Sequence, residues 1–437
     1  MHRFKEARSS NALSRFQLFP FAALSASYFA HIGFFNPYLP LWLKDLGFSI
    51  TIIGLLTAVQ AATRVLAPYG WGWLSDHTGE RVKLLRFCAG AALICSAGLL
   101  VEGSVVWIAV VLLLMFIHTS AMMPMSEAAL AHLVSTDQGF DSRRYGRVRL
   151  WGSLGFLITV FVAGAWFEHQ GMQSFPVWAV GSLLALNVSV WWLPNRKEAT
   201  HHDGVQLSVM PVLRQRKVQW FFATVFFHVL SHIGIYVFFS LYLDELGYSK
   251  TMIGVLWAVS VAAEIVWFFT QSRWLPKFSL SMWLFICAAA MVLRMVLTTW
   301  AAEWLWALLF AQVLHALTFA TQHTACIALL SHHFPGRLRG RGQALYASIG
   351  YGVPGVLGAL CGGALSDAFG LSSVYAVSIG TAMLACMCAW QCTRQNIKTE
   401  STYLIQEHIW LAAFSMRDPV LDNGWPGSMR SEMQTAR

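Results

Sequence analysis

The sequence predicts an all-α integral membrane protein, with twelve transmembrane helices in two pseudo-symmetric bundles of six. Three observations predict this fold. Hydrophobic residues make up 57% of the 437-residue chain and charged residues only 12%, the apolar residues form repeated long blocks, and a segment of the first half recurs in the second. A block of about 20 apolar residues crosses the hydrocarbon core of a bilayer as a helix. The helix is required because backbone polar groups find no water there.

The apolar blocks place six spans in each half of the chain. In the first half the spans are expected at residues 17–42, 51–74, 84–101, 104–133, 148–167 and 175–194. In the second half they are expected at residues 217–243, 251–272, 281–300, 303–330, 344–366 and 371–393. The chain therefore divides into an N-terminal tail (1–16), a first bundle (17–194), a linker (195–216), a second bundle (217–394) and a C-terminal tail (395–437), which we expect to be mobile.

An internal repeat supports the division into two bundles. Residues 39–65 align without a gap on residues 239–265, and the offset of 200 superposes the loop Leu46–Thr51 on Leu246–Thr251. Chance similarity between apolar sequences is the alternative, but the shared loop pattern Leu-Gly-(Phe/Tyr)-Ser-x-Thr argues against it. Two parallel six-helix repeats are typical of transporters whose site lies at the midplane between the halves.

Basic residues are concentrated in the N-terminal tail and in the loops after even-numbered spans. They are Arg3, Lys5, Arg8, Arg15, Arg81, Lys83, Arg143, Arg144, Arg147, Arg196, Lys197, Arg214, Arg216, Lys217, Arg273, Lys277, Arg337, Arg339 and Arg341. The loops after odd-numbered spans hold only Lys44 and Lys250. Because cytoplasmic loops carry the excess of Lys and Arg, we expect both termini and the linker in the cytoplasm.

Several classes of protein are disfavoured by what the sequence contains. The net charge of +9 is dispersed over short loops, so it does not indicate a nucleic-acid partner. The eight cysteines all fall within predicted spans, where we expect them to pack in the core, without a disulfide framework or a metal site. The sequence has neither a phosphate loop nor an H-E-x-x-H motif, which argues against an ATP-driven pump and a metalloprotease. We expect no enzyme activity, no cofactor, and a proton gradient as the energy source.

Four ionisable residues other than His lie deep in predicted spans: Arg64, Glu127, Glu264 and Arg294. Each costs ~2.5–3.5 kcal/mol at a helix centre, so we expect a water-filled cavity and mutual pairing. Purely structural ion pairs are the alternative. Arg64 and Glu264 occupy the same position of the two repeats, and a pseudo-twofold axis would bring both toward one central cavity. A receptor or a structural membrane protein would need neither these charges nor the repeat.

The loop after the second span reads GWLSDHTGER over residues 72–81. It resembles the G-x-x-x-D-R-x-G-R-R signature of the major facilitator superfamily, with His77 where the family has Arg. An Asp at a helix end can pair with an Arg and bias which way the two halves rock, and glycines allow a tight turn and close helix approach. A solvated turn is the alternative. The residues expected to act in gating are Gly72, Asp76, Gly79 and Arg81.

A second motif, YGRVRLWGS over residues 145–153, opens the fifth span. Together with Glu127 it resembles lactose permease and its relatives, which implies that Arg149 and Glu127 bind substrate. The two lie at similar depth, each 11 residues from a hairpin tip near Gln138. Phe156 stands where the sugar permease stacks a Trp on galactose. With Arg64, these residues are the predicted substrate site.

In the second half, Glu264, Arg294 and His315 resemble the proton-handling set of the same permease. Thr318 stands where that permease has a carboxylate, and His323 is a candidate substitute. The resemblance implies a proton-coupling role for Glu264, Arg294, His315 and His323. The remaining membrane histidines are expected to form hydrogen bonds between helices: His118, His132, His228 and His232.

Most of residues 20–395 also resembles the bacterial 3-phenylpropionate permease group, through the 145–153 motif, an Ala-Glu in the eighth span and L-H-x-x-T-F from Leu314. This implies import of an aromatic monocarboxylate by proton symport, by a monomer in the lipid bilayer of the bacterial inner membrane. A sugar or nucleoside symporter and a drug-efflux antiporter are the alternatives. Such exporters carry a G-x-x-x-G-P run in the fifth span, whereas residues 150–167 contain no Pro.

Overall fold

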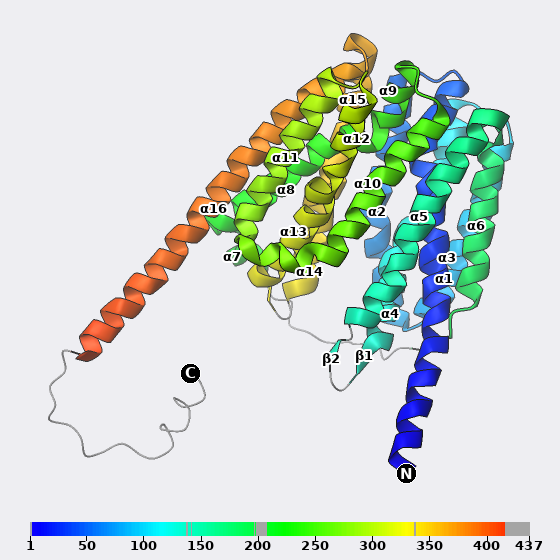
Figure 1. Ribbon diagram of the computed structural model, residues 1–437. Helices are drawn as coiled ribbons and strands as arrows, with labels where there is room; N and C mark the ends of the chain where they lie inside the picture. The colour runs from blue at the N-terminus through cyan, green and yellow to red at the C-terminus, as the bar shows by residue number, and fades with distance from the viewer. Residues whose placement is uncertain are drawn as a thin grey trace.

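The fold is a bundle of long helices, shown by a computed structural model of the chain (Figure 1). The structure describes residues 2–136, 139–140, 142–195, 197, 208–335 and 338–415, with side chains for 18–130, 148–195, 197, 208–335 and 338–395. Within these residues twelve helical spans are long and apolar enough to cross a membrane. The predicted fold class and number of spans are therefore confirmed.

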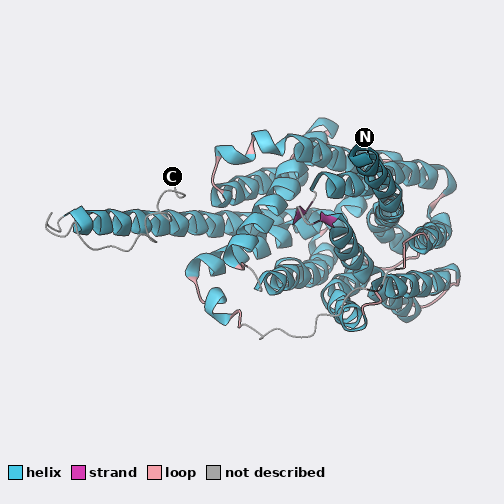
Figure 2. Ribbon diagram, turned by 90° about the horizontal axis from the view of Figure 1, so that it is seen from below, coloured by secondary structure: helices cyan, strands magenta, loops and turns pink. Residues whose placement is uncertain are grey.

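In the first half, the described residues form six α-helices, two 3₁₀ turns and one short hairpin. The helices are α1 (His2–Asp45), α2 (Ile50–Thr78), α3 (Arg81–Ser96) continued by the 3₁₀ turn η1 (Ala97–Leu100), α4 (Val105–Val134), α5 (Ser142–Gln170), the 3₁₀ turn η2 (Met172–Ser174) and α6 (Phe175–Trp191). The strands β1 (Ser135–Thr136) and β2 (Gly139–Phe140) pair antiparallel between α4 and α5 (Figure 2). Each strand has two residues, so the pair does not alter the all-α fold class. It flanks the predicted hairpin tip, Gln138, which lies outside the described residues.

In the second half, several spans are broken into segments of different helical type. The elements are α7 (Met210–Leu213), α8 (Arg216–Ile233), η3 (Gly234–Phe238), α9 (Phe239–Glu245), α10 (Lys250–Thr270), η4 (Gln271–Arg273), η5 (Leu275–Lys277), α11 (Leu280–Trp300), α12 (Leu305–Val313), η6 (Ala316–Thr321), α13 (Gln322–His333), α14 (Arg339–Leu345), η8 (Tyr346–Gly352), α15 (Val353–Phe369) and α16 (Ser372–Ser415). Among them η3, η6 and η8 are π-helical. All π-helical segments of the described residues belong to this half.

The first and last helices extend beyond the predicted spans. Helical backbone begins at His2, within the predicted N-terminal tail, and α16 continues to Ser415, beyond the expected end of the last span. The part of the C-terminal tail that the structure describes is therefore helical, and the expected mobility of the tail stays a prediction. The start of α1 and the end of α16 lie at one end of the bundle (Figure 1), which we call the terminal end.

The repeated loop has the same conformation in both halves. Gly47 and Gly247 have φ values of 83° and 84°, the left-handed conformation that ends a helix at low steric cost. Two residues later, Ser49 and Ser249 each accept a hydrogen bond from a backbone N–H in the next helix. These serines cap the helices that follow, as residues of their type commonly do. The shared Leu-Gly-(Phe/Tyr)-Ser pattern thus specifies two equivalent helix–turn–helix connections.

The two halves are joined near these loops, at what we call the closed end. Lys44 Nζ lies 3.0 Å from Asp244 Oδ2, at equivalent positions of the repeats. Glu168 at the end of α5 accepts a hydrogen bond from the Lys250 backbone N–H at 2.5 Å. Asp367 at the end of α15 accepts hydrogen bonds from the backbone N–H groups of Ile50 (3.2 Å) and Thr51 (2.9 Å). Each half therefore supplies a carboxylate that caps a helix of the other half.

The cysteine prediction holds for most positions but not for all. Cys88, Cys287, Cys326, Cys388 and Cys392 are buried, and Cys95 and Cys386 are partly buried. Cys361 is exposed, so the expectation that it packs in the core is wrong. A long membrane helix has an outward face as well as an inward one, and an apolar span does not reveal which face a cysteine occupies.

Candidate functional site

A cavity of about 510 Å³ lies between the two halves. Its walls repeat the sequence symmetry, because several positions of the first repeat and their equivalents 200 residues later both line it. The pairs are Asn36 and Tyr236, Pro37 and Val237, Thr57 and Trp257, Gln60 and Ser260, Ala61 and Val261, and Arg64 and Glu264. The expectation that Arg64 and Glu264 face one central cavity is confirmed. They do not pair with each other within 4.0 Å among the described contacts.

Close packing of α1 against α5 places two predicted residues in the cavity wall. A Cβ atom added at Gly33 would lie 2.7 Å from the Phe156 carbonyl oxygen, and one at Gly155 would lie 2.3 Å from the Ala26 carbonyl oxygen. Only glycine permits this approach of the two backbones. As a result, Arg149 and Phe156 of α5 both line the cavity.

Arg149 has weak partners within the protein. Its guanidinium carbon lies 4.2 Å above the centre of the Phe29 ring, in cation–π geometry. Its Nε lies 3.7 Å from Glu127 Oε1, which is ion-pair distance but too long for a hydrogen bond. Both side chains are more than one-third exposed. Glu127 lies behind Arg149, beside a small pocket next to α1, and does not line the main cavity.

Arg64 lines the same cavity from α2 and is exposed. Among the described residues it forms neither a hydrogen bond nor an ion pair. The first half thus presents two cationic groups to the cavity whose hydrogen-bonding capacity is largely unused. Nearby, the side-chain amides of Gln60 and Asn36 bond to each other at 2.9 Å.

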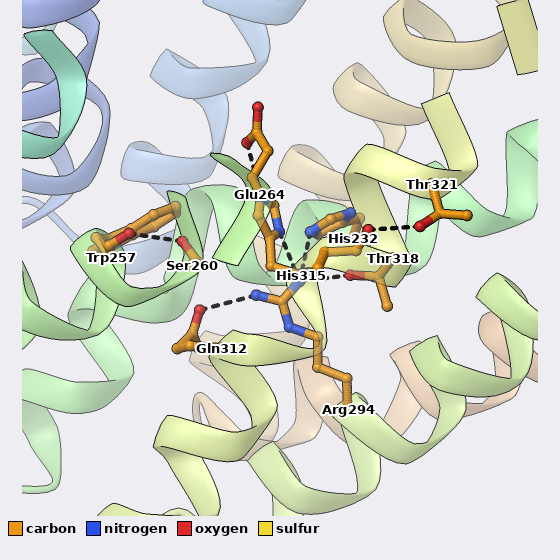
Figure 3. A network of polar contacts seen from close by, with 10 residues as sticks. His232, Trp257, Ser260, Glu264, Arg294, Gln312, His315, Thr318 and Thr321 are labelled. Atoms are coloured by element: carbon orange, nitrogen blue, oxygen red, sulfur yellow. Dashed lines mark hydrogen bonds and ion pairs between the residues drawn. The ribbon is translucent and has the colours of Figure 1, made fainter. Parts of the chain in front are cut away.

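Arg294 of α11 lies in a different setting, fully buried among uncharged acceptors (Figure 3). Its Nη1 lies 2.9 Å from His232 Nε2, 3.2 Å from His315 Nδ1 and 3.0 Å from Thr318 Oγ1. Its Nη2 donates to Gln312 Oε1 at 2.9 Å. Among the described residues Arg294 contacts no carboxylate, so the mutual pairing expected for the buried charges does not include a direct Arg294–Glu264 pair.

These contacts fix the tautomer of His315. Because a guanidinium can only donate, His315 Nδ1 must accept from Arg294, and the proton of the neutral ring then resides on Nε2. That nitrogen lies 3.7 Å from Glu264 Oε2. His315 therefore stands between the arginine and the carboxylate and orients a donor toward Glu264, which is 8% exposed. Its ring also stacks on Phe319, with centroids 5.0 Å apart.

Thr318 stands where the related permease has a carboxylate, and His323 was the candidate substitute for that carboxylate. Thr318 binds Arg294, as a carboxylate at that position would. His323 lines the cavity but its Nδ1 lies 3.4 Å from the Tyr346 hydroxyl, away from the Arg294 network. The geometry thus brings together Glu264, His315 and Arg294, and leaves His323 in a separate cluster.

The other histidines divide into different environments. His228 Nε2 lies 2.7 Å from the Thr318 carbonyl oxygen, which is the predicted bond between helices. His232 also bonds across helices, but to Arg294, a role that was not assigned from the sequence. Its equivalent in the first repeat is Ile32, and this polar replacement was the available signal. His118 bonds to Leu114 of its own helix, so that prediction is wrong. The side chain of His132 lies outside the described residues.

The motif at the terminal end forms a compact turn. Arg81 Nη2 lies 2.9 Å from Asp76 Oδ1 and its Nε donates to Ser75 Oγ at 3.1 Å. Gly79 ends α2 with a φ of 68°, as a tight turn requires. Gly72 behaves otherwise, because a Cβ added there would meet no atom within 4 Å. The expectation that Gly72 allows close helix approach is therefore wrong.

Several aromatic residues of the cavity wall were not singled out from the sequence. They are Phe29, Tyr236, Trp257, Phe319, Tyr346 and Tyr351. Aromatic residues are common throughout the spans, at 14% of the chain, so their type alone does not mark a site. Only the relative rotation of the helices selects those that face the cavity.

Comparisons with known proteins identify the family and the fold. The sequence model of the MFS_1 like family matches residues 22–377. The probable 3-phenylpropionic acid transporter of Escherichia coli strain K12 is 26% identical over 333 residues, covering 75% of this chain and 85% of that protein. The maltose permease of Geobacillus stearothermophilus is 24% identical over 351 residues, covering 79% and 87%.

Solved structures share the fold at low identity. The nucleoside transporter NupG has a TM-score of 0.74 with 14% identity and covers 86% of this chain and 99% of its own. A bacterial homologue of the human lysosomal transporter Spinster, in an inward-facing and unoccupied conformation, has a TM-score of 0.65 with 14% identity, covering 88% and 98%.

Proposed function

The chain belongs to the MFS_1 like family, and from this membership we propose that it imports an aromatic monocarboxylate together with a proton. It is a multi-pass membrane transporter of the major facilitator superfamily and not an enzyme. The substrate, the coupled proton and the location in a bacterial inner membrane are parts of the proposal. The E. coli relative, whose printed name refers to 3-phenylpropionic acid, supports the choice of substrate class.

The charge of the cavity carries the proposal. Among the residues that line it, Arg64 and Arg149 are cationic and Glu264 is anionic, so with neutral histidines the formal sum is +2 − 1 = +1. A single carboxylate on the substrate would neutralise that charge. Arginine suits this role, because its planar fork can donate two parallel hydrogen bonds to a carboxylate. The surrounding aromatic rings, including Phe29 and Phe156, offer an apolar surface for the rest of an aryl acid.

Coupling to one proton also follows from charge. A substrate carboxylate adds −1 and a proton on Glu264 adds +1, so the loaded carrier has the same charge as the empty one. Moving an uncompensated charge through a low-dielectric interior is costly, and equal charge lets the carrier reorient in both states at similar cost. We therefore expect one proton per monocarboxylate and electroneutral transport.

Glu264 is the proposed proton site and His315 its positioning residue. Glu264 borders the cavity, and His315 Nε2 carries a proton that can stabilise the ionised carboxylate. A shift of α10 relative to η6 would change the 3.7 Å separation between His315 Nε2 and Glu264 Oε2, which would link helix movement to the proposed proton site. Arg294 fixes the tautomer of His315 and does not exchange protons itself.

The bias in basic loops supports a cytoplasmic location for the terminal end. The closed end would then face outward, where its contacts between the halves would restrict access to the cavity from outside. A cysteine replacing Leu246 should react with a membrane-impermeant thiol reagent added outside intact cells, and one replacing Asp203 should not. The reverse pattern would place the termini outside.

Transport in membrane vesicles with an imposed pH gradient tests the function. The native chain should accumulate 3-phenylpropionate when the imposed proton gradient runs in the direction of uptake. Glu264→Gln should abolish accumulation yet preserve exchange of labelled for unlabelled substrate, because exchange needs no net proton release. Accumulation by the Gln variant would rule out Glu264 as the proton site. Proton-driven uptake of maltose or a nucleoside in place of the aryl acid would favour the sugar or nucleoside alternative, and extrusion would indicate antiport.

A further inference from the structure

A cluster of neutral polar side chains lines the cavity wall of the second half, apart from the Glu264 network. The hydroxyl oxygens of Tyr346 and Tyr351 lie 3.2 Å apart, and the Tyr346 hydroxyl lies 3.4 Å from His323 Nδ1. All three residues line the cavity, and Tyr346 is 6% exposed. We call Tyr346, Tyr351 and His323 the tyrosine cluster. The proposed charge neutralisation and proton coupling make no use of it.

The cluster exists because η8 is π-helical. Residues five apart in an α-helix, at 100° per residue, are separated by about 140° around the axis. Tyr346 and Tyr351 would then point in different directions. In a π-helix, whose hydrogen bonds join residues five apart, they lie one above the other. The ring centroids are 5.2 Å apart. Such segments are uncommon overall, but those that occur are often found at functional sites. The π-helical backbone is therefore what brings the two hydroxyls together.

The cluster cannot satisfy all of its own hydrogen-bonding groups. If Tyr351 donates to Tyr346 and Tyr346 donates to His323 Nδ1, then His323 Nε2 keeps a free donor and Tyr351 keeps free lone pairs. If the chain of donors runs the other way, Tyr351 has the free donor and His323 the free acceptor. In either direction one donor and one acceptor of the cluster have no partner within it, and neither carries a charge.

The cluster lies at the depth of Arg149 on the opposite wall. Glu168 and Asp367, the equivalent caps at the closed end, are 199 residues apart. On α5 the same offset places the equivalents of Tyr346 and Tyr351 at positions 147 and 152, on either side of Arg149. A substrate whose carboxylate is bound by Arg149 would therefore direct its other end across the cavity toward the tyrosine cluster.

We propose that the tyrosine cluster binds a ring hydroxyl of the substrate, so that the preferred substrates are hydroxyaryl carboxylates. A hydroxyl group both donates and accepts, which matches the cluster, and it is neutral, so its binding leaves the proposed balance of one carboxylate and one proton unchanged. This inference rests on the proposed transport of aromatic acids and narrows it to those with a phenolic group.

Competition for the uptake of labelled 3-phenylpropionate, in vesicles containing the full chain, tests the inference. The competitors are 3-phenylpropionate and its analogues with a hydroxyl at ring position 2, 3 or 4. In the native protein at least one hydroxylated isomer should bind about tenfold more tightly than the unsubstituted acid, as one net hydrogen bond allows. Tyr351→Phe should remove most of that preference, measured as the ratio of the affinities for the hydroxylated and the unsubstituted acid in the same variant. Tyr346→Phe should act in the same direction.

Tyr375→Phe is the matched control, because Tyr375 is buried in the same half and its hydroxyl donates to the Gly234 carbonyl away from the cavity. It should keep the preference. Binding of 3-phenylpropionate with no advantage for any hydroxylated isomer would overturn the tyrosine-cluster assignment alone. A preference that survives in both Tyr variants would overturn it as well. Failure of every aryl acid to bind the native protein would overturn the proposed function and this inference together.

Discussion

The two halves of the bundle share a repeated scaffold but hold their arginines in opposite ways. In the first half, Arg64 is exposed in the cavity, and the partners of Arg149 among the described side chains are a ring and a distant carboxylate. In the second half, Arg294 is 0% exposed and makes four contacts with neutral acceptors. The first half thus keeps its cations available for a ligand, whereas the second half uses its cation to organise histidines around Glu264.

The backbones of the two cavity walls also differ. The wall of the first half is formed by α-helices packed closely through glycines such as Gly33 and Gly155. The wall of the second half includes η3, η6 and η8, whose π-helical turns supply Tyr236, Phe319 and Tyr346 to the cavity. Pseudo-symmetry therefore places equivalent positions at equal depth. Because the residue types at those positions differ, we propose anion binding for one wall and proton handling for the other.

The largest expected effect comes from Arg294→Lys. An ammonium group cannot replace two guanidinium nitrogens that bind acceptors in different directions, and each hydrogen bond to a charged group contributes about 1.5–3 kcal/mol. We expect a loss of about 3 kcal/mol in stability, seen as a lower midpoint of thermal denaturation in detergent. Arg64→Lys is the control and should leave the midpoint unchanged. Equal midpoints for both variants would contradict the different structural roles of the arginines in the two halves.

Arg149→Lys should instead weaken substrate binding and leave stability intact. Lysine keeps the charge but lacks the bidentate fork, so we expect a loss of about 1.5–3 kcal/mol in binding, roughly ten- to a hundredfold in Kd. Equilibrium binding of labelled 3-phenylpropionate to purified protein measures it. An unchanged Kd would remove Arg149 from the proposed site and leave Arg64 as the anion-binding residue.

Asp76→Asn compares the gating motif of the first half with its second-half counterpart, Arg273–Lys277, which lacks an Asp. Asp76 lies at the terminal end, outside the cavity, and pairs with Arg81 at 2.9 Å. We expect the rate of transport to fall about tenfold, a change of about 1.4 kcal/mol in the barrier, with substrate affinity altered by no more than a few fold. A large loss of binding would place Asp76 in the substrate site.

The smallest effect is expected at the closed end, where the halves are most alike. Asp367→Asn and Glu168→Gln each remove one negative charge from the N-terminus of a helix in the other half, an interaction of about 0.3–1 kcal/mol. Either change should shift the carrier modestly toward the outward-open state. The reaction of a cysteine replacing Ser153 in the cavity with an impermeant thiol reagent, added outside, should become up to about fivefold faster. Unequal effects of the two variants would show that the two capping interactions at the closed end are not energetically equivalent, although their contacts are similar.

Much of the framework could be predicted because it depends on local chemistry. The alternation of long apolar blocks with basic loops specifies twelve spans, and the Gly47–Ser49 and Gly247–Ser249 patterns specify two equivalent turns. Arg64 and Glu264 could be placed in one cavity because the repeat puts them at the same position and a buried charge needs a polar environment. Gly72 and Cys361 were interpreted wrongly because an apolar span does not reveal which way a given face turns.

The sequence by itself therefore determined the membrane environment, the number of helices, the repeat and the shared cavity of Arg64 and Glu264. Only the tertiary structure decided how those residues are connected: His315 between Arg294 and Glu264, Glu127 behind Arg149, and Tyr346 above Tyr351 in a π-helical turn. The reason is physical. Burial in a membrane span is a property of composition along the chain, whereas a hydrogen bond between helices depends on rotations and shifts of about an ångström that are set by the packing of many side chains at once.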